Sequence, residues 1–293
     1  MVINVDGVIL INKEKDFTSR DVVNIVSKHL KIKKVGHTGT LDPLATGVLA
    51  ICVGKATKIV ELITSNDKEY IAKVVLGITS DTLDISGNII HEEKCYKTKE
   101  EIKTVLNNMI GTYEQVVPIY SAVRVKGKKL YEYARNNEEV EPPKRLVDIK
   151  ELNLLGDIKY DNDKVIFEVK CKVSKGTYIR SLIRDIAANL NTVGLMSELV
   201  RTKHGNFAIE DCITIDEFKN NKYSIKSIHE VLTNYPHFKV DEKLEQDIRY
   251  GKIINNIYGY NEILFTDFNG KALALYKEYD KDKNKIRPWK MFI

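Results

Sequence analysis

The 293-residue chain lacks long apolar runs, paired cysteines and clusters of metal-ligand residues. Its apolar runs are far shorter than the roughly 20 residues that a membrane-spanning helix needs, so we expect no membrane association. The N-terminus has no basic lead ahead of a long apolar segment, which predicts no signal peptide and a cytoplasmic location. The four cysteines form no CxxC pair, so we expect reduced thiols, no disulfide framework and no metal site.

Positive charge is in slight excess, with 46 Lys and Arg against 41 Asp and Glu and a formal net charge of +5. This balance permits a polyanionic partner but does not require one, because many solvated surfaces look alike in composition. The basic residues gather at 31–34 and 124–129, and 15 tyrosines supply rings with a polar edge that suit stacking. Composition alone leaves a nucleic-acid surface and an ordinary solvated surface as equal alternatives.

Helical and strand patterns are mixed without regular alternation, which favours an α+β fold over a doubly wound one. Strict apolar alternation at 165–173 predicts a half-buried strand, and apolar runs predict strands at 7–13 and 70–77. Capping boxes that start at Thr18 and Thr98 predict two helices. Cys52 and Cys171 lie in apolar strand-like runs and are expected in the core. The other predicted elements are helices at 55–64 and 182–190, strands within 112–126, and a short helix in an exposed excursion at 127–144.

The chain is expected to divide near residue 234, where Asn-Tyr-Pro-His resembles a linker. The larger region, 1–233, would hold one large core. The smaller region, 234–293, shows a helical pattern at 241–250. It also shows a hairpin pattern whose strands flank Asn269-Gly270. We therefore predict a small β-rich second domain.

Asp42 is the main candidate for chemistry. It precedes a proline within a loop that contains Gly36, Gly39 and Gly47, and no second acid accompanies it. A carboxylate on a stiff turn beside an apolar strand suits a nucleophile, although an Asp-Pro turn with a capping role is the common alternative. A phosphate-binding loop is disfavoured because no Gly-Lys-Ser/Thr follows the glycines.

Tyr178 and Arg180 are two residues apart, so on an extended chain both side chains point to one face. Arg180 could then form a forked, charge-assisted pair with Asp42 and aim its carboxylate. Tyr178 could stack on a planar substrate. The alternative is an ordinary junction between a strand and a helix.

Four further residues have both a functional and a structural interpretation. His37 could stack in a gap left in a nucleic acid, or be a surface residue of its loop. Lys13 could meet a phosphate or be solvated at the end of the first strand. Tyr70 and Leu199 are at positions that more often serve packing than function.

Several segments together resemble the TruB family of tRNA pseudouridine synthases, in order and over essentially the whole chain. The segment 39–49 looks like the catalytic-aspartate motif of that family, and 175–182 looks like its second block. The chain departs from the family after the first strand, where Asn12-Lys13-Glu14-Lys15-Asp16 lacks the usual glycine. The C-terminal region resembles a PUA-like RNA-binding domain loosely, through its length, position and final Arg-Pro-Trp. Further matching segments are 7–13 with Thr18-Ser19, 120–122, 127–134 and 199–207.

This resemblance implies the pseudouridine-synthase fold, a mixed and mostly antiparallel sheet flanked by helices, with the PUA-like domain at 234–293. A loop at about 124–149 would be mobile and close over the RNA. The implied activity is isomerisation of uridine 55 in the T-loop of tRNA, with flipping of the base and without a cofactor or metal. The implied roles are Asp42 as nucleophile, Arg180 as its partner, Tyr70, Tyr178 and Leu199 around the base, His37 in vacated RNA space, and Lys13 in substrate binding.

The partner implied is the T-arm stem-loop of tRNA, bound by a monomer that uses no guide RNA and also aids tRNA folding. The lack of a long Lys-rich tail favours a stand-alone enzyme over the guide-RNA-dependent relatives of the same family. A non-catalytic RNA-binding or RNA-folding protein on the same scaffold is the other alternative.

Overall fold

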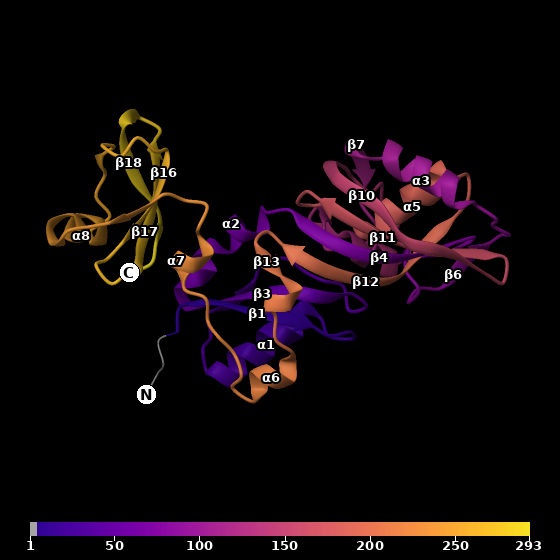
Figure 1. Ribbon diagram of the computed structural model, residues 1–293, viewed down its shortest axis with the longest axis horizontal. Helices are drawn as coiled ribbons and strands as arrows, with labels where there is room; N and C mark the ends of the chain where they lie inside the picture. The colour runs from indigo at the N-terminus through magenta and orange to yellow at the C-terminus, as the bar shows by residue number, and fades with distance from the viewer. Residues whose placement is uncertain (1–4) are drawn as a thin grey trace.

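The computed structural model describes residues 5–293, in which one large and one small sheet form the frame of an elongated molecule (Figure 1). The large sheet contains β1 (Gly7–Lys13), β2 (Val35–His37), β3 (Thr46–Val53), β4 (Lys68–Leu76), β7 (Gly111–Val116), β10 (Lys144–Asp161), β11 (Lys164–Val173), β12 (Gly194–His204) and β13 (Phe207–Ala208).

The large sheet follows the order β1-β3-β12-β4-β11-β10-β7, with β2 paired to β3 and β13 to β12. Every pairing within it is antiparallel except that of β12 with β3, where Val200 lies opposite Thr46 and Arg201 opposite Gly47. The predicted α+β class with a mixed, mostly antiparallel sheet is therefore confirmed. The alternation predicted at 165–173 is also confirmed, since β11 buries every second residue.

Within residues 5–293, seven helices accompany the large sheet and its connections. They are α1 (Ser19–Leu30), α2 (Val60–Thr64), α3 (Lys99–Asn108), α4 (Leu130–Arg135), α5 (Ile179–Asn189), α6 (Ile215–Lys219) and α7 (Ile228–Val231), with 3-10 turns at Gly54–Ile59 and Ile209–Asp211. Both predicted capping boxes are present, from Thr18 to Asp21 and from Thr98 to Glu101. No helix within residues 5–293 has the length and apolar character needed to cross a membrane.

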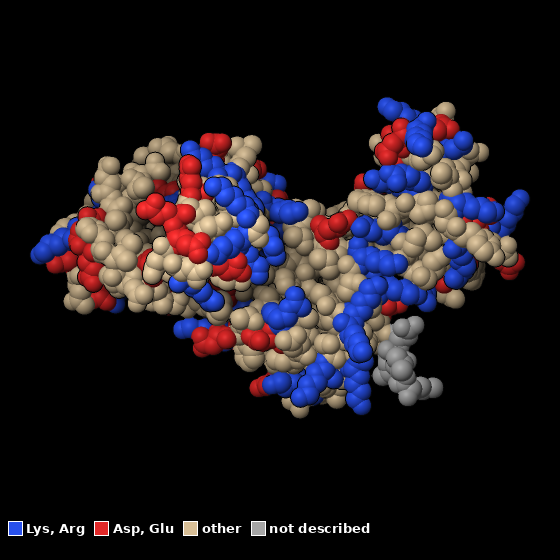
Figure 2. Space-filling model, turned by 180° about the vertical axis from the view of Figure 1, so that it is seen from behind, with Lys and Arg blue, Asp and Glu red and all other residues tan. Residues whose placement is uncertain are grey.

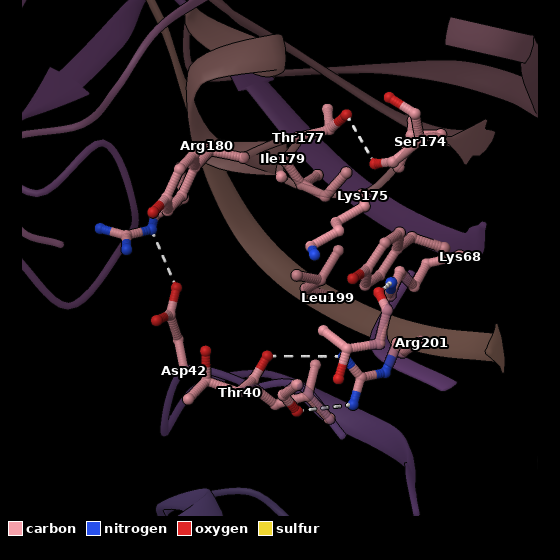
Figure 3. Close-up of a pocket in the computed structure, with 17 residues that line it drawn as sticks. Thr40, Asp42, Lys68, Ser174, Lys175, Thr177, Ile179, Arg180, Leu199 and Arg201 are labelled. Atoms are coloured by element: carbon pink, nitrogen blue, oxygen red, sulfur yellow. Dashed lines mark hydrogen bonds and ion pairs between the residues drawn. The ribbon is translucent and has the colours of Figure 1, made fainter. Parts of the chain in front are cut away.

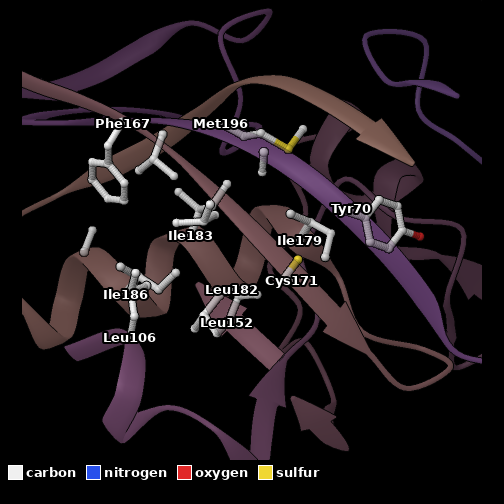
Figure 4. Packing of buried hydrophobic residues seen from close by; sticks show 14 of the residues in the cluster. Tyr70, Leu106, Leu152, Phe167, Cys171, Ile179, Leu182, Ile183, Ile186 and Met196 are labelled. Carbon is white, nitrogen blue, oxygen red and sulfur yellow. The ribbon is translucent and has the colours of Figure 1, made fainter. Parts of the chain in front are cut away.

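Helices α3 and α5 pack on the sheet and close the main core (Figure 4). Leu106 of α3 and Ile183 and Ile186 of α5 are almost completely buried there, as is Phe167 of β11. Each such side chain contributes about 1.5–3 kcal/mol by leaving water. Because α5 begins beside the candidate site, this core also fixes the position of the site.

Five strands form the second sheet at one end of the molecule, in the order β14-β16-β17-β18-β15 (Figure 1). Its side chains share a core with the large sheet, in which Leu275 and Phe292 pack with Val8 and Ile59. The predicted β-rich C-terminal part is thus present, while the division at residue 234 stays a prediction. The elements are β14 (His237–Lys239), α8 (Glu242–Arg249), β15 (Ile254–Asn255), β16 (Glu262–Thr266), β17 (Ala272–Tyr279) and β18 (Asp282–Met291).

One predicted helix was wrong in its bounds, and one predicted excursion was right. The helix predicted at 55–64 is split into the 3-10 turn Gly54–Ile59 and the short α2, because the Thr57 hydroxyl bonds the Gly54 carbonyl and tightens the first turn. The exposed excursion predicted at 127–144 ends near Pro143, as expected, while the mobile loop implied at about 124–149 stays a prediction. Residues from Lys144 onward belong to β10, which pairs in continuous register with β7. The excursion itself contains β8 (Arg124–Val125), β9 (Lys128–Lys129) and α4, and a further hairpin joins β5 (Ile78–Ser80) to β6 (Ile89–Glu92).

Candidate active site

A cavity of about 260 Å³ lies where the glycine loop, strands β4 and β12, and the turn before α5 meet (Figure 3). This volume lies below the roughly 300–1,000 Å³ typical of pockets for drug-sized ligands, so it suits one small planar group. Of the predicted site residues, the structure brings Asp42, Tyr70, Tyr178, Arg180 and Leu199 together around this cavity. The other lining residues are Gly39, Thr40, Leu41, Thr64, Lys68, Val173, Ser174, Lys175, Gly176, Thr177, Ile179 and Arg201.

The loop that carries Asp42 is tied to the sheet by a buried arginine. The Arg201 guanidinium donates to the carbonyls of Gly39 at 3.2 Å, Thr40 at 3.4 Å and Val48 at 2.7 Å. Only 1% of Arg201 is exposed, and no carboxylate within residues 5–293 forms an ion pair with it. A buried charge costs free energy unless polar groups bind it. The three carbonyls supply these hydrogen bonds, so the Arg201 guanidinium holds the loop in place.

Gly47 explains how the loop can approach β12. Its φ is +103°, a region that favours glycine, and a Cβ there would lie 2.2 Å from the Arg201 carbonyl oxygen. On the other side of the loop, the Leu41 N–H donates to the Ser19 hydroxyl at 2.8 Å. Asp42 therefore stands on a backbone that is fixed from both sides.

Arg180 is the direct partner of Asp42. Its Nε lies 2.9 Å from Oδ2 of Asp42, and the dashed line in Figure 3 marks this ion pair. The expected forked pair is wrong, because NH1 donates to the Thr82 carbonyl and NH2 to the Tyr120 carbonyl. The Asp42 side chain remains 43% exposed while that of Arg180 is 7% exposed. The carboxylate is held at one oxygen and is open to the cavity.

The chain is not extended at Arg180, so the first of the two alternatives for Tyr178 and Arg180 does not hold. Tyr178 is the N-cap of α5 and Arg180 lies in the first turn of that helix. Both still face the cavity, because the turn at 174–177 brings the helix start to its rim. The structural alternative, a junction between strand and helix, describes the backbone correctly.

Asp84 is a second carboxylate near Arg180 that the sequence did not single out. Its Oδ2 lies 3.9 Å from Nε of Arg180 and its side chain is 7% exposed. Ser86 donates to Asp84 Oδ1 through both its backbone N–H and its hydroxyl, and Thr82 donates to it as well. Asp84 does not line the cavity, so it faces Arg180 from behind.

Tyr70 and Leu199 form the apolar wall of the cavity. They lie on the adjacent strands β4 and β12, where Leu199 is opposite Ala72 and Tyr70 is opposite Arg201. Each is less than one-tenth exposed. Burial raises the pKa of the Tyr70 phenol, so it is neutral at ordinary pH. A flat neutral ring beside an aliphatic side chain is a surface on which a base can stack.

Three buried basic residues lie on the sheet side of the site, namely Lys68, Arg201 and His204. Burial lowers the pKa of Lys68 to about 8, with Arg201 and Lys175 adding to the effect. Burial likewise lowers the pKa of His204 to about 3, with further contributions from Arg201 and Lys68. His204 bonds the Thr38 hydroxyl through Nδ1 and the Ile63 carbonyl through Nε2, which fits a neutral ring.

Lys13 and His37 do not line the cavity. Lys13 is completely buried, and its Nζ donates to the carbonyls of Glu14, Phe17 and Pro43. The solvated alternative for Lys13 was therefore wrong, and burial lowers its pKa to about 8. His37 ends β2, is half-buried, and accepts the Gly39 N–H at its Nδ1. Burial lowers its pKa too, with Arg20 and Arg201 contributing.

Strand periodicity could have identified two of the missed residues. Lys68 precedes Tyr70 by two positions and Arg201 follows Leu199 by two, so each pair shares one face of its strand. Asp84 gave no such signal, because the hydroxyl-rich turn around it resembles any surface turn. Within residues 5–293 no group of three or more His, Cys, Asp or Glu is placed to hold a metal ion.

Two family models match adjacent parts of the chain. Residues 27–179 match the family model described as TruB family pseudouridylate synthase (N terminal domain), and residues 180–235 match the tRNA pseudouridylate synthase B C-terminal domain. A protein of Bacillus cytotoxicus called tRNA pseudouridine synthase B is 40% identical, with 98% of this chain and 97% of that protein covered. One of the same name from Caldanaerobacter subterraneus subsp. tengcongensis is 41% identical, with 99% and 100% covered.

Solved structures support the same fold. A chain in "Crystal Structure of a Cbf5-Nop10-Gar1 Complex" matches with a TM-score of 0.71 at 24% identity, and the match covers 98% of this chain and 85% of the other. At that identity the likeness speaks for the fold alone. The family models and the curated relatives go further, and together they show that the chain belongs to the TruB family of pseudouridylate synthases.

Proposed function

We propose that this protein isomerises uridine 55 in the T-loop of tRNA to pseudouridine, with Asp42 as the nucleophile. The observation that carries the proposal is an accessible Asp42 carboxylate, held by Arg180 above a cavity whose wall is Tyr70 and Leu199. The names of the similar proteins point to tRNA as the substrate class. The position within tRNA and the role of Asp42 rest on the resemblance of residues 39–49 to the family motif.

In the proposed isomerisation, all bonds and protons balance within one nucleotide. The bond from N1 of uracil to C1′ of the ribose breaks, the ring rotates in the cavity, and a bond forms from C5 to C1′. C5 loses a proton and N1 gains one, so no external oxidant, reductant or co-reactant enters the proposal. One accessible carboxylate therefore satisfies its need for a nucleophile.

The position of Asp42 requires the target base to leave its stack. A side chain within a cavity cannot reach the sugar of a stacked loop nucleotide, and extrusion costs a few kcal/mol. Stacking on the Tyr70 ring would return about 1–3 kcal/mol. Tyr178 would contact the same base from the start of α5, and Leu199 would close its other side.

We assign His37 and Lys13 different parts in this proposal. His37 would occupy space that the base leaves in the RNA, since it is half-buried and adjoins the loop of Asp42. Lys13 would act from behind the loop, because three backbone carbonyls already bind its ammonium group. It would contribute to substrate binding by fixing the Pro43 carbonyl and thus the turn after Asp42.

The basic side chains would contact phosphates. Figure 2 shows Lys and Arg in two bands, one that descends from the C-terminal sheet and one over the body that contains the large sheet. A hollow separates the two bands.

We propose that the chain divides near residue 234 and that the C-terminal part is a PUA-like RNA-binding domain. We also propose that the excursion between β7 and β10 closes over the T-arm.

The direct test uses purified protein and a bare T-arm stem-loop. We expect pseudouridine at the position of uridine 55 without any added RNA or protein, from a monomer in solution. Product that forms only when a guide RNA is added would support the guide-RNA-dependent relatives instead. RNA binding or assisted folding without any product would support the non-catalytic alternative.

A further inference from the structure

Helix α5 begins without a capping side chain of its own. Tyr178 is its N-cap and makes no side-chain capping bond. In a capping box, the N–H of the N-cap residue is bound by an acid or amide three residues later. That position is Ser181 here, and its hydroxyl donates to the Val116 carbonyl instead. The Tyr178 N–H is bound by a residue of another element, since it donates to Oε1 of Gln115 in β7 at 2.8 Å.

The Gln115 amide is buried and bonded at both ends. Only 1% of the residue is exposed. Its Nε2 donates to the Tyr113 hydroxyl at 2.8 Å, and that hydroxyl donates to Oδ2 of Asp185 at 3.0 Å. The other oxygen of Asp185 accepts from Arg184. These partners fix the amide orientation, because only its oxygen can accept the Tyr178 N–H.

This bond lies at the place where the backbone enters the site. Tyr178 lines the cavity, and Arg180, two residues further on, reaches from the helix start to Asp42 (Figure 3). The carbonyls of Thr82 and Tyr120 hold the guanidinium end of Arg180. Gln115 holds the backbone end. The two sets of bonds together determine where Arg180 places the Asp42 carboxylate.

We propose that Gln115 is a positioning residue for pseudouridine formation, which acts by fixing the first turn of α5 so that Arg180 can aim Asp42. The inference rests on the proposed function. Loss of the bond would leave the half-buried Tyr178 N–H without its partner, and the helix start would shift to reach water. Because small displacements of reacting groups are costly to rate, we expect the chemical step to slow by about tenfold.

The test compares Gln115→Met with Arg180→Lys and with the double variant. The rate of pseudouridine formation is measured in single turnover at saturating T-arm stem-loop, and the dissociation constant of the RNA is measured separately. We expect Gln115→Met to slow the rate about tenfold with less than about a threefold change in binding. In the Arg180→Lys background it should slow the rate by less than about threefold, because the two residues act as one unit.

One control separates positioning from a loss of stability, and a second variant stands in if Gln115→Met does not fold. Ile186→Val, on the buried face of the same helix, lowers stability by about 0.5–1.5 kcal/mol without touching the helix start. It should leave the single-turnover rate unchanged. If Gln115→Met does not fold, Gln115→Asn replaces it, since the shorter side chain keeps a polar amide but withdraws its oxygen from the Tyr178 N–H.

The inference is overturned if either Gln115→Met or, in its place, Gln115→Asn leaves the rate unchanged, changes RNA affinity alone, or slows the rate equally in both Arg180 backgrounds. A rate loss that Ile186→Val reproduces would also overturn it. Turnover by the unaltered protein tests the proposed function separately, so the two failures can be told apart.

Discussion

At the residue scale, the site consists of one open carboxylate and several buried cations that the fold keeps in place. Asp42 faces the cavity, whereas Arg201 and Lys13 bind backbone carbonyls of its loop. Burying these cations costs free energy that well-directed hydrogen bonds offset. These two cations fix the backbone of the loop, and the Asp42 side chain that the loop carries faces the cavity.

His204 makes stability depend on pH. Its pKa is about 3 in the folded protein and 6.5 ordinarily, because burial and the nearby Arg201 and Lys68 disfavour the charged ring. Between these values the unfolded chain binds more protons than the folded one, so the free energy of unfolding falls as pH falls. The slope from this group is at most about 1.4 kcal/mol per pH unit.

The check is urea unfolding of the unaltered protein and of His204→Gln between pH 7 and pH 4. Glutamine can donate to the Ile63 carbonyl as Nε2 does, but it does not titrate. We expect the stability of the variant to fall less steeply with decreasing pH. Parallel curves for the two proteins would show that His204 is not the source of the dependence.

Much of the site could be predicted from single residues. Asp42, Tyr70, Tyr178, Arg180 and Leu199 do surround one cavity, although no pattern revealed their distances. Buried bonds to carbonyls could not be predicted, because they depend on how distant loops meet. This is why Lys13 was expected in solvent or at a phosphate and lies instead beneath the loop.

At the scale of elements, local sequence signals correctly predicted the starts of α1 and α3. Thr18 and Thr98 both form the predicted capping boxes, because their bonds depend only on residues within one turn. The start of α5 could not be predicted in this way, since its N-cap is bound by Gln115 of β7. Of the two alternatives for Tyr178 and Arg180, the junction of a strand and a helix is the one found, because α5 already begins at Ile179.

The cap of α3 offers a test of element stability. Thr98→Ala removes the hydroxyl that accepts the Glu101 N–H, and should lower the free energy of unfolding by about 1 kcal/mol. Thr104→Ala is the matched control on the same helix, because that hydroxyl only donates back to the Glu100 carbonyl. We expect the control to be neutral or slightly stabilising in urea unfolding. Equal losses for both variants would contradict the capping account.

At the scale of the whole molecule, the two sheets form an elongated frame, and basic side chains gather in bands on one face of it (Figures 1 and 2). The order of elements could be predicted broadly as α+β. The pairing of β12 between β3 and β4 could not, because it joins segments far apart in the chain. That pairing brings Leu199 and Arg201 to the site.

RNA affinity should therefore depend on salt. Lys126 is exposed in the excursion between β7 and β10 and forms no ion pair within the described part of the chain. If it contacts a phosphate, Lys126→Gln should weaken T-arm binding and reduce the slope of log affinity against log salt by roughly 0.7–0.9. Lys103→Gln, on exposed α3 away from the cavity, is the control and should change neither quantity. An unchanged slope for Lys126→Gln would remove this residue from the RNA interface.

The most direct test of the central claim is pseudouridine formation by Asp42→Asn on tRNA. Asparagine keeps the size of the side chain and a carbonyl oxygen that can accept from Arg180, but removes the nucleophilic charge. We expect tRNA binding to remain and pseudouridine formation to be abolished. Normal turnover by Asp42→Asn would contradict the account.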